Sequence, residues 1–417
     1  MNKLDNLKYW VWLTLTFLPS NPVKWTYLNE FSNVREAYEK TISNDLTATQ
    51  KEILKKHKAV KLDKCEQLIE YCLNNGIKIY CYEDEDYPQR FRSIFNPPSV
   101  LFVLGSLENI NSELTLAVIG AREPCDYSVR VASRISYELA KAGTVLVSGF
   151  ALGIDSVAHK SAIEAGSKTI AVIGCGLDID YPKENSKFKS LIAKNGAIIS
   201  EYPPKTPVKR HYFVARNRLI AALSLGIVII EAGESSGTLN TAGYALSYGN
   251  EIFVVPPHDV FDSRFYGQTK LLRDGATPAF SHTDIMFPYY SQYSHKLKML
   301  NFASEVDVYA DEKQEAADNT NKKAKKSSGK SKGMQKDSAE EIVLEASFDE
   351  FSVDYESLSP TQKQICEALR EGVKHCDQLS VELKIRIETV LSDLTELEVY
   401  GYVEAISGKR YRLLNID

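Results

Sequence analysis

The sequence predicts an α/β protein with a doubly wound, mostly parallel Rossmann-like sheet, preceded by an all-α module and followed by a winged-helix module. Three observations lead to this prediction. Short runs of valine and isoleucine alternate with amphipathic helical stretches from Leu116 to Val255, which is typical of parallel strands buried on both faces. Residues 1–82 carry apolar side chains near the helical spacing of 3.6. Residues 357–417 combine three helical stretches with a hairpin.

The central domain is expected to span residues 83–290. Its apolar runs are bounded by glycine or serine, and right-handed crossovers place the carboxyl ends of such strands at one edge of the sheet, where ligands bind. The expected strands are Leu116–Ile119, Val145–Val147, Thr169–Ile173, Ala197–Ile199, Ile227–Ile230 and Ile252–Val255.

Charge is distributed unevenly along the chain. The formal net charge is -5, yet no Asp or Glu lies between Glu201 and Glu231. Local charge, rather than net charge, indicates a phosphate-binding segment here. Cationic residues in this segment surround the aromatic pair Tyr212 and Phe213, and they are Lys205, Lys209, Arg210, His211, Arg216 and Arg218.

Small residues follow three of the expected strands. Backbone N–H groups and helix N-termini at such junctions can bind anions, and Arg122 can add a charge-assisted contact. The alternatives are tight strand-to-helix turns at the first two junctions and ordinary helix capping at the third. The candidate residues are Gly120 with Arg122, Ser148 with Gly149, and Ser236 with Gly237.

No cofactor-binding motif is complete. Gly174-Cys175-Gly176 has Ile179 where a dinucleotide fingerprint needs its third glycine, and Gly329-Lys330-Ser331 has Ala324 where a Walker A loop needs glycine. Asp155 and His159 have the spacing of an acid/base or metal pair, but no second histidine or cysteine accompanies them, so a capping Asp and a hydrogen-bonded structural His is the stronger interpretation. We therefore expect no cofactor and no metal.

Cysteine usage and hydropathy favour a cytoplasmic location. The 7 cysteines include no C-x-x-C pair, which is typical of a reducing compartment. The apolar run Tyr9–Leu18 follows two lysines but lacks a signal-peptide cleavage pattern, and no segment reaches the roughly 18 apolar residues of a membrane span.

Taken in order, the motifs resemble the bacterial DNA-processing protein A family, also called DprA or Smf. The resemblance covers residues 83–280. The positions that carry it are Tyr87-Pro88, Pro97-Pro98, Leu101, Gly105, Gly120-Ala121-Arg122, Ser148 to Asp155, His159, Tyr181-Pro182, Ser200-Glu201, Phe213, Arg216-Asn217-Arg218, Ser236-Gly237, Ala242, Pro256 and Gly275-Ala276.

The resemblance implies a non-catalytic, homodimeric protein that binds single-stranded DNA and loads RecA recombinase during natural transformation or DNA processing. Apolar surface near a sheet edge at Ile227–Ile230 and Ala242–Leu246 also favours a homodimer. Arg122, Lys209 and Arg210 would hold phosphates, and Phe213 would stack on a base. Arg216 and Arg218 would line or brace the pocket. Alternatively, Phe213 is a core aromatic residue, and one of these two arginines pairs with a carboxylate.

Two positions depart from the family pattern. Ala121 replaces the serine or threonine that often precedes the arginine of the first motif, and Gly267-Gln268-Thr269 has Thr269 where the family has an asparagine two places after the glycine. The N-terminal module, expected to be of the SAM or helix-hairpin-helix type, lacks the glycine-rich hairpin of the latter.

The low-complexity stretch at residues 305–356, with Lys322–Lys326, is expected to be a flexible linker. Beyond it, the third helix of the winged-helix module is acidic and would be repelled by phosphates. We expect a protein-contact or regulatory role for this module, and its remaining candidates for DNA contact are Lys409, Arg410 and Arg412.

Two other functions compete with this interpretation. A nucleotide phosphoribohydrolase of the lysine-decarboxylase-like family shares the sheet type, but its catalytic glutamate is replaced here by Thr241. A winged-helix transcription factor would require sequence-specific duplex binding by residues 357–417 alone.

Overall fold

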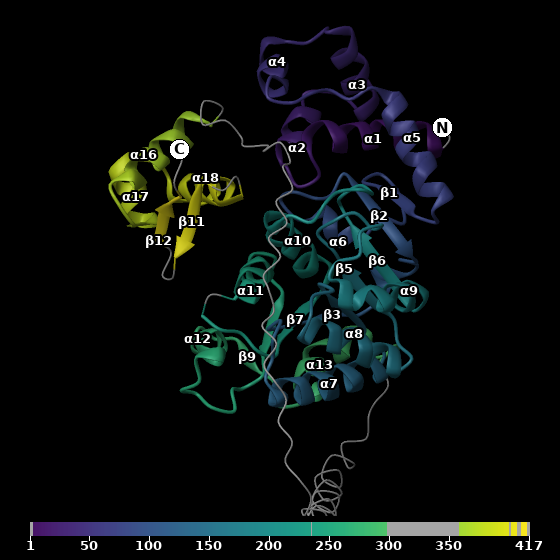
Figure 1. Ribbon diagram of the computed structural model, residues 1–417, viewed down its shortest axis with the longest axis vertical. Coiled ribbons are helices and arrows are strands. Elements are labelled where there is room, and N and C mark those ends of the chain that lie inside the picture. Colours follow the sequence, from purple (N-terminus) through teal and green to yellow (C-terminus); the bar gives the residue numbers. More distant parts are fainter. Residues whose placement is uncertain (1–2, 235, 298–357, 400–401, 407–409, 415–417) are drawn as a thin grey trace, which may run out of the picture. The chain divides into compact units, whose positions relative to one another are not determined.

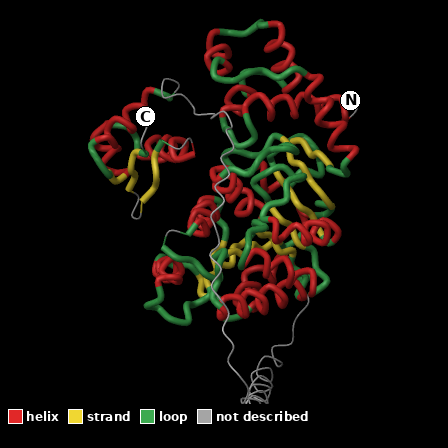
Figure 2. Tube along the Cα trace, in the orientation of Figure 1, coloured by secondary structure: helices red, strands yellow, loops and turns green. Residues whose placement is uncertain are grey.

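The computed structural model describes residues 3–234, 236–297, 358–399, 402–406 and 410–414 (Figures 1 and 2). The expected linker at residues 305–356 lies outside the described residues. In the part of the chain that is described, no helix is long and apolar enough to cross a membrane.

A mostly parallel sheet forms the centre of the molecule and confirms the predicted fold class. Its strand order is β1-β2-β6-β5-β4-β3-β7-β8-β9. Neighbours from β6 through β9 in this order pair in parallel, whereas β2 pairs antiparallel with both of its neighbours, β1 and β6. The strands are β1 Lys78–Cys81, β2 Val100–Gly105, β3 Thr115–Ile119, β4 Val145–Ser148, β5 Thr169–Val172, β6 Gly196–Ser200, β7 Gly226–Ile229, β8 Glu251–Val254 and β9 Thr277–Pro278.

Three strands were not expected from the sequence. β1 lies in a stretch that the sequence pattern assigns to helix, and it begins two residues after Gly76, whose φ of +66° turns the chain away from the end of α5 (Leu62–Asn74). A positive φ is readily adopted only by glycine. The two-residue β9 is too short to show a pattern, whereas β2 is a six-residue apolar run that lies before the strand and helix alternation beginning at Leu116.

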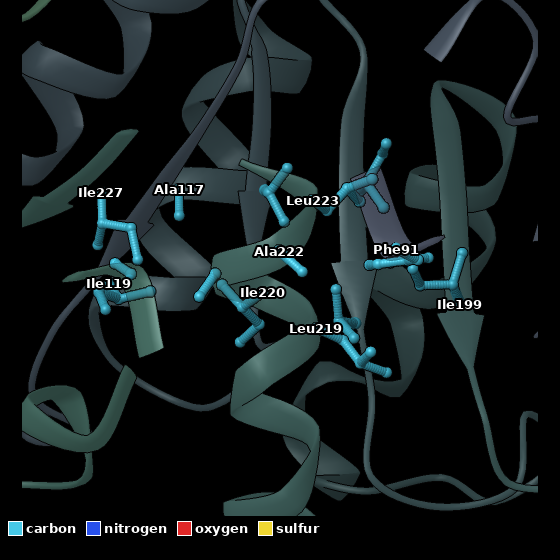
Figure 3. Close-up of a cluster of buried hydrophobic side chains, with 14 of the residues drawn as sticks. Phe91, Ala117, Ile119, Ile199, Leu219, Ile220, Ala222, Leu223 and Ile227 are labelled. Atoms are coloured by element: carbon cyan, nitrogen blue, oxygen red, sulfur yellow. The ribbon is translucent and has the colours of Figure 1, made fainter. Parts of the chain in front are cut away.

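Helices cover both faces of this sheet. α10 (Arg210–Leu223) and α11 (Gly237–Ser247) pack together on one face, over a core that includes Ala117 and Ile199 (Figure 3). α9 (Ser186–Lys194) packs against Ile198 on the opposite face, alongside α8 (Ile154–Glu164) and α7 (Asp126–Lys141). Shorter helices complete the domain: α6 Gln89–Arg92, α12 Tyr266–Arg273, α13 His282–Met286 and α14 Tyr290–Tyr293.

The N-terminal module consists of five helices in the described residues: α1 Lys3–Phe17, α2 Val23–Leu28, α3 Val34–Ser43, α4 Ala48–Leu54 and α5 Leu62–Asn74. The aromatic side chains of α1 are buried and share one apolar cluster with Phe102 of β2 and Ile198 of β6. The indole of Trp25 donates a hydrogen bond to the carbonyl of Pro97 at 2.9 Å. Apolar burial and polar contacts therefore both attach this module to the sheet.

A buried lysine lies at this junction. The Lys24 ammonium is 0% exposed and donates hydrogen bonds to Pro19 O at 2.6 Å and to Asn96 Oδ1 at 2.8 Å. Burial lowers the pKa of Lys24 to about 7, while the charge of Glu201 opposes this shift and that of Arg218 adds to it. Burial disfavours the charged form of an amine.

This pKa predicts a pH-dependent stability. Between pH 7 and the ordinary lysine value of 10.5 the unfolded chain binds more protons at this residue than the folded chain, so stability rises with pH. From pH 7 to pH 9 the free energy of unfolding of the wild type should rise by about 2 kcal/mol relative to that of Lys24→Met. Urea titrations of both proteins measure this difference, and parallel pH profiles would contradict the prediction.

The C-terminal module has the expected three helices and hairpin. α16 (Pro360–Arg370) begins at a capping box formed by Ser359 and Gln362, and it is followed by α17 (Cys376–Leu383) and α18 (Ile387–Val399). The strands are β10 Lys374–His375, β11 Val403–Ile406 and β12 Arg410–Leu413, in the order β10-β12-β11.

The candidate DNA contacts of this module differ in their environment. Arg412 forms an ion pair with Glu404, Arg410 is exposed, and Lys409 lies outside the described residues.

On α18 the carboxylate of Glu396 accepts a hydrogen bond from Gln362 at 2.6 Å. Acidic α18 thus does not present the charge that a DNA-reading helix needs.

Candidate nucleic-acid interface

The strand order reverses between β3 and β7. From β3 the chain proceeds to β4, β5 and β6 in one direction, and β7, β8 and β9 lie in the other. Ligands of doubly wound sheets bind at such a switch point, outside the carboxyl ends of the strands. All loops that follow β3 to β8 meet at this edge, and these loops together with α10 and the start of α11 contain the candidate residues predicted from the sequence.

The loop after β3 presents Arg122 to solvent. Its backbone lies against the start of α8, where Ile154 N donates to Ala121 O at 3.1 Å. Gly153 has a φ of +76°, and a Cβ there would lie 2.4 Å from Ala121 O and 2.5 Å from Arg122 O. Only glycine fits this contact. The start of α8 thus fixes the position of Arg122. At Gly120 a Cβ would lie 2.7 Å from the side chain of Ile154.

Ser148 and Gly149, at the end of β4, are both buried. The hydroxyl of Ser148 is buried and donates to Val118 O at 2.7 Å, and the amide of Gly149 donates to Asp155 Oδ2 at 3.0 Å. Both residues were expected from the sequence to contact DNA. Because their polar groups are already bonded within the protein, the structure instead shows them supporting the loop.

Asp155 and His159 are both buried. Asp155 holds the loop after β4, since its Oδ2 also accepts from Ala151 N at 3.2 Å. His159 Nδ1 lies 2.7 Å from Thr169 Oγ1, and burial, with a smaller effect of Arg216, lowers the pKa of His159 to about 3. A neutral, hydrogen-bonded histidine agrees with the structural interpretation.

Arg216 is a brace in the interior. Its NH1 donates to Gly149 O at 2.6 Å and also to Val172 O, and its guanidinium lies over the ring of Phe213 at 5.5 Å. Burial lowers the pKa of Arg216 to about 10, against the attraction of Asp155. The side chain is therefore still charged at neutral pH, yet only 4% exposed.

Arg218 is buried as well. Its NH2 donates to Glu201 Oε2 at 2.6 Å, and the side chains of the pair are 8% and 1% exposed. One of the alternatives drawn from the sequence was that one of the two arginines pairs with a carboxylate, and Arg218 forms this pair with Glu201. Both arginines therefore lie inside the protein, and the bracing role fits the structure better than the lining role.

The accessible positive charge lies around the start of α10 and on the loop after β3. We define the cationic rim as Arg122, Lys205, Lys209 and Arg210. Arg122, Lys205 and Arg210 are exposed, and Lys209 is half-buried with its ammonium 5.8 Å from the ring centroid of Tyr212. α10 begins at Arg210 and has no acidic residue in its first turn, so the positive end of the helix dipole adds to the rim.

Next to the rim lies an aromatic pair. Phe213 is half-buried and its ring centroid lies 5.3 Å from that of Tyr181. The first turn of α10 lies so close to the loop after β5 that a Cβ added at Gly174 would be only 3.1 Å from Tyr212 O. Sequence reasoning used Tyr181 only as a family motif and missed its position beside Phe213.

The loop after β7 contributes Ser236 and Gly237. Ser236 Oγ accepts from Thr238 N at 3.2 Å and caps α11, as the capping alternative expected. A Cβ on Gly237 would meet no atom within 4 Å, so its backbone faces open space. Ser235 lies outside the described residues.

Gln268 supports the same edge and was also missed in this role. Its amide is 0% exposed, accepts from Ala232 N at 3.2 Å, and donates to Ile230 O at 2.8 Å and to Val255 O at 2.7 Å. Gln268 thus connects the chain just after β7 to the chain just after β8. Nothing in the sequence pattern indicated this role.

Fold and site together define a Rossmann-like protein with exposed cations at the carboxyl edge of its sheet and an additional winged-helix module. The chain belongs to the DNA recombination-mediator protein A family, whose model matches residues 78–289. Residues 352–409 match the DprA winged helix domain.

Individual relatives agree with this assignment. The chain is 37% identical to the DNA processing protein DprA of Bacillus subtilis over 50% of its own length and 70% of that protein. It is 32% identical to the protein Smf of Synechocystis over 79% of this chain and 78% of that protein. The crystal structure of DprA from Streptococcus pneumoniae matches with a TM-score of 0.53 at 27% identity, over 69% of this chain and 96% of that chain.

Proposed function

We propose that this protein binds single-stranded DNA along the carboxyl edge of its sheet and catalyses no reaction. The observation that carries this proposal is the cationic rim, which lies next to an accessible aromatic pair; Lys205, Lys209, Arg210 and Phe213 belong to the segment without acidic residues. Arg122, Lys209 and Arg210 bind phosphates, and backbone N–H groups near Ser236, Gly237 and Gly120 line the track. Cations that follow the backbone, together with aromatic rings for the bases, are the requirements of sequence-tolerant single-strand binding.

Phe213→Ala should weaken binding of oligo-dT about 10-fold without unfolding the protein. Stacking of one base on an aromatic ring contributes about 1 to 3 kcal/mol, and each 1.4 kcal/mol corresponds to about tenfold in affinity. Fluorescence anisotropy with a labelled oligonucleotide measures the change, and a thermal melt serves as the control for folding. Unchanged affinity would exclude Phe213 from base stacking.

The bound strand is passed to the recombinase RecA, and the protein acts in the cytoplasm during natural transformation or other DNA processing. Membership of a family of recombination mediators supports this step. The test is RecA-dependent strand exchange on DNA coated with single-strand-binding protein. Adding this protein should increase the rate, and no stimulation at any ratio would overturn the loading role.

We further propose that the protein is a homodimer. The sequence analysis based this expectation partly on apolar surface at Ile227–Ile230, but these residues are buried because β7 pairs with β3 and β8. Of the other predicted segment, Ala242–Leu246, Leu246 is 64% exposed and continues to support the proposal. Light scattering at micromolar concentration should give twice the mass of the chain, and a monomer would contradict it.

The hydrolase alternative lacks its carboxylate in the structure as well. Thr241, at the position of the expected glutamate, is buried and its hydroxyl donates to Gly237 O at 3.4 Å. Incubation with nucleoside monophosphates should therefore release no free base. Release of base would overturn the non-catalytic proposal.

A further inference from the structure

Tyr181 is the more accessible ring of the aromatic pair. Its side chain is 40% exposed, and it belongs to the loop that follows β5. Phe213 is half-buried, and one of its faces lies under the guanidinium of Arg216 at 5.5 Å. A base that approaches this pair from solvent therefore meets Tyr181 first.

The geometry of the pair determines where a base can stack. The two ring centroids are 5.3 Å apart and the ring planes are tilted by 56°. A base inserted between two parallel rings would need about 7 Å, twice the roughly 3.5 Å separation of stacked carbon atoms. The pair is too close and too tilted for such a sandwich, so a base stacks on its outer surface.

The loop that carries Tyr181 is held on both sides. Before it, Lys189 Nζ donates to Ile179 O at 2.8 Å and to Asp180 Oδ1 at 3.2 Å. After it, Asn185 Nδ2 donates to Phe150 O at 3.0 Å and to Ala151 O at 3.2 Å. A ring positioned in advance loses little entropy when a ligand binds.

The local charges suit a nucleic-acid backbone. Asp180, the acidic neighbour of Tyr181, forms an ion pair with Lys189. Lys183, two residues beyond Tyr181, is exposed, as is the acidic Glu184 that follows it. Lys183 and the exposed Arg210, three residues before Phe213, place a cation in each of the two segments that carry the rings.

We propose that Tyr181 is a base-stacking residue, and that an unpaired nucleobase stacks on its exposed ring with Phe213 packed against it as the second part of one platform. The inference rests on the proposed single-strand binding and adds the residue that meets the base. Because every base has a π face, the subsite accepts purines and pyrimidines alike.

The test compares two ligands of equal length, oligo-dT and an abasic oligomer that keeps the sugars and phosphates. Affinities are measured by anisotropy for the wild type, Tyr181→Ala and Tyr181→Phe. The matched control is Tyr137→Ala, since Tyr137 is half-buried on α7 and its ring is contacted by Lys141 at 5.7 Å. Tyr181→Ala should weaken oligo-dT binding about 10-fold and leave abasic binding unchanged, whereas Tyr181→Phe and Tyr137→Ala should bind like the wild type.

Three results would overturn the subsite. Tyr181→Ala binding oligo-dT within about twofold of the wild type would exclude stacking, because one stacked base contributes more than that. Equal weakening of both ligands would show that Tyr181 acts on the backbone or on the loop. If the wild type binds neither ligand, the proposed function itself fails and the subsite fails with it.

Discussion

Replacing Arg218 with methionine will lower the free energy of unfolding by about 3 to 5 kcal/mol, because the Glu201 carboxylate is then left buried without its partner. The two side chains are 2.6 Å apart and only 8% and 1% exposed. Methionine keeps much of the buried volume, so the expected loss is mainly electrostatic. Urea denaturation followed by circular dichroism measures it.

The double variant Arg218→Met with Glu201→Gln provides the control. It removes both charges and should recover part of the lost stability, since replacing both members of a buried pair is much less costly than removing one. A single variant that loses less than about 1 kcal/mol would show that Glu201 is solvated or protonated. Equal losses in the single and double variants would show that packing, rather than charge, is responsible.

The second large effect is expected at the cationic rim. Replacing Arg122, Lys209 and Arg210 together with alanine should weaken binding of oligo-dT about 100-fold at low salt. Each lost charge-assisted contact contributes on the order of 1 kcal/mol or more, and three such losses correspond to about two factors of ten. Anisotropy titrations of the variant and the wild type measure the ratio.

The opposite edge of the sheet offers a matched control. Lys141, Lys168 and Lys194 are exposed and lie in the segments that precede β4, β5 and β6. Replacing these three lysines with alanine removes the same charge from the amino ends of the strands. The affinity should change less than about threefold, because DNA phosphates bound at the rim would lie a strand length away, beyond the screening length of the solution. If both triple variants lose affinity equally, then net charge rather than the rim governs binding.

Strand positions could be predicted from the sequence, and the directions of side chains could not. The central strands are buried on both faces, so their valine and isoleucine runs stand out, and β7 at Gly226–Ile229 lies within one residue of its expected start at Ile227. β1 escaped prediction because its four residues follow α5 after only three others, which is too little for alternation to be seen.

At the candidate site, too, the position of an element could be predicted from the sequence, whereas the directions of its side chains could not. The acid-free segment marked α10 correctly as the cationic element, but its helical geometry turns Arg216 and Arg218 inward and leaves Arg210 outside. Only the three-dimensional placement of Asp155 and Glu201 explains these directions. Tyr181 could not be paired with Phe213 from sequence, because Tyr181 lies on the loop after β5 and Phe213 lies on α10, and the two meet only at the edge of the sheet.

The salt dependence of oligo-dT affinity tests most directly whether the rim binds a polynucleotide backbone. For single strands the slope of log affinity against log salt is about −0.7 for each phosphate neutralised. The wild type should therefore show a slope of at least about −2 from Arg122, Lys209 and Arg210, and the triple variant should lose most of it. A flat dependence for the wild type, or the same slope in the triple variant, would contradict the account.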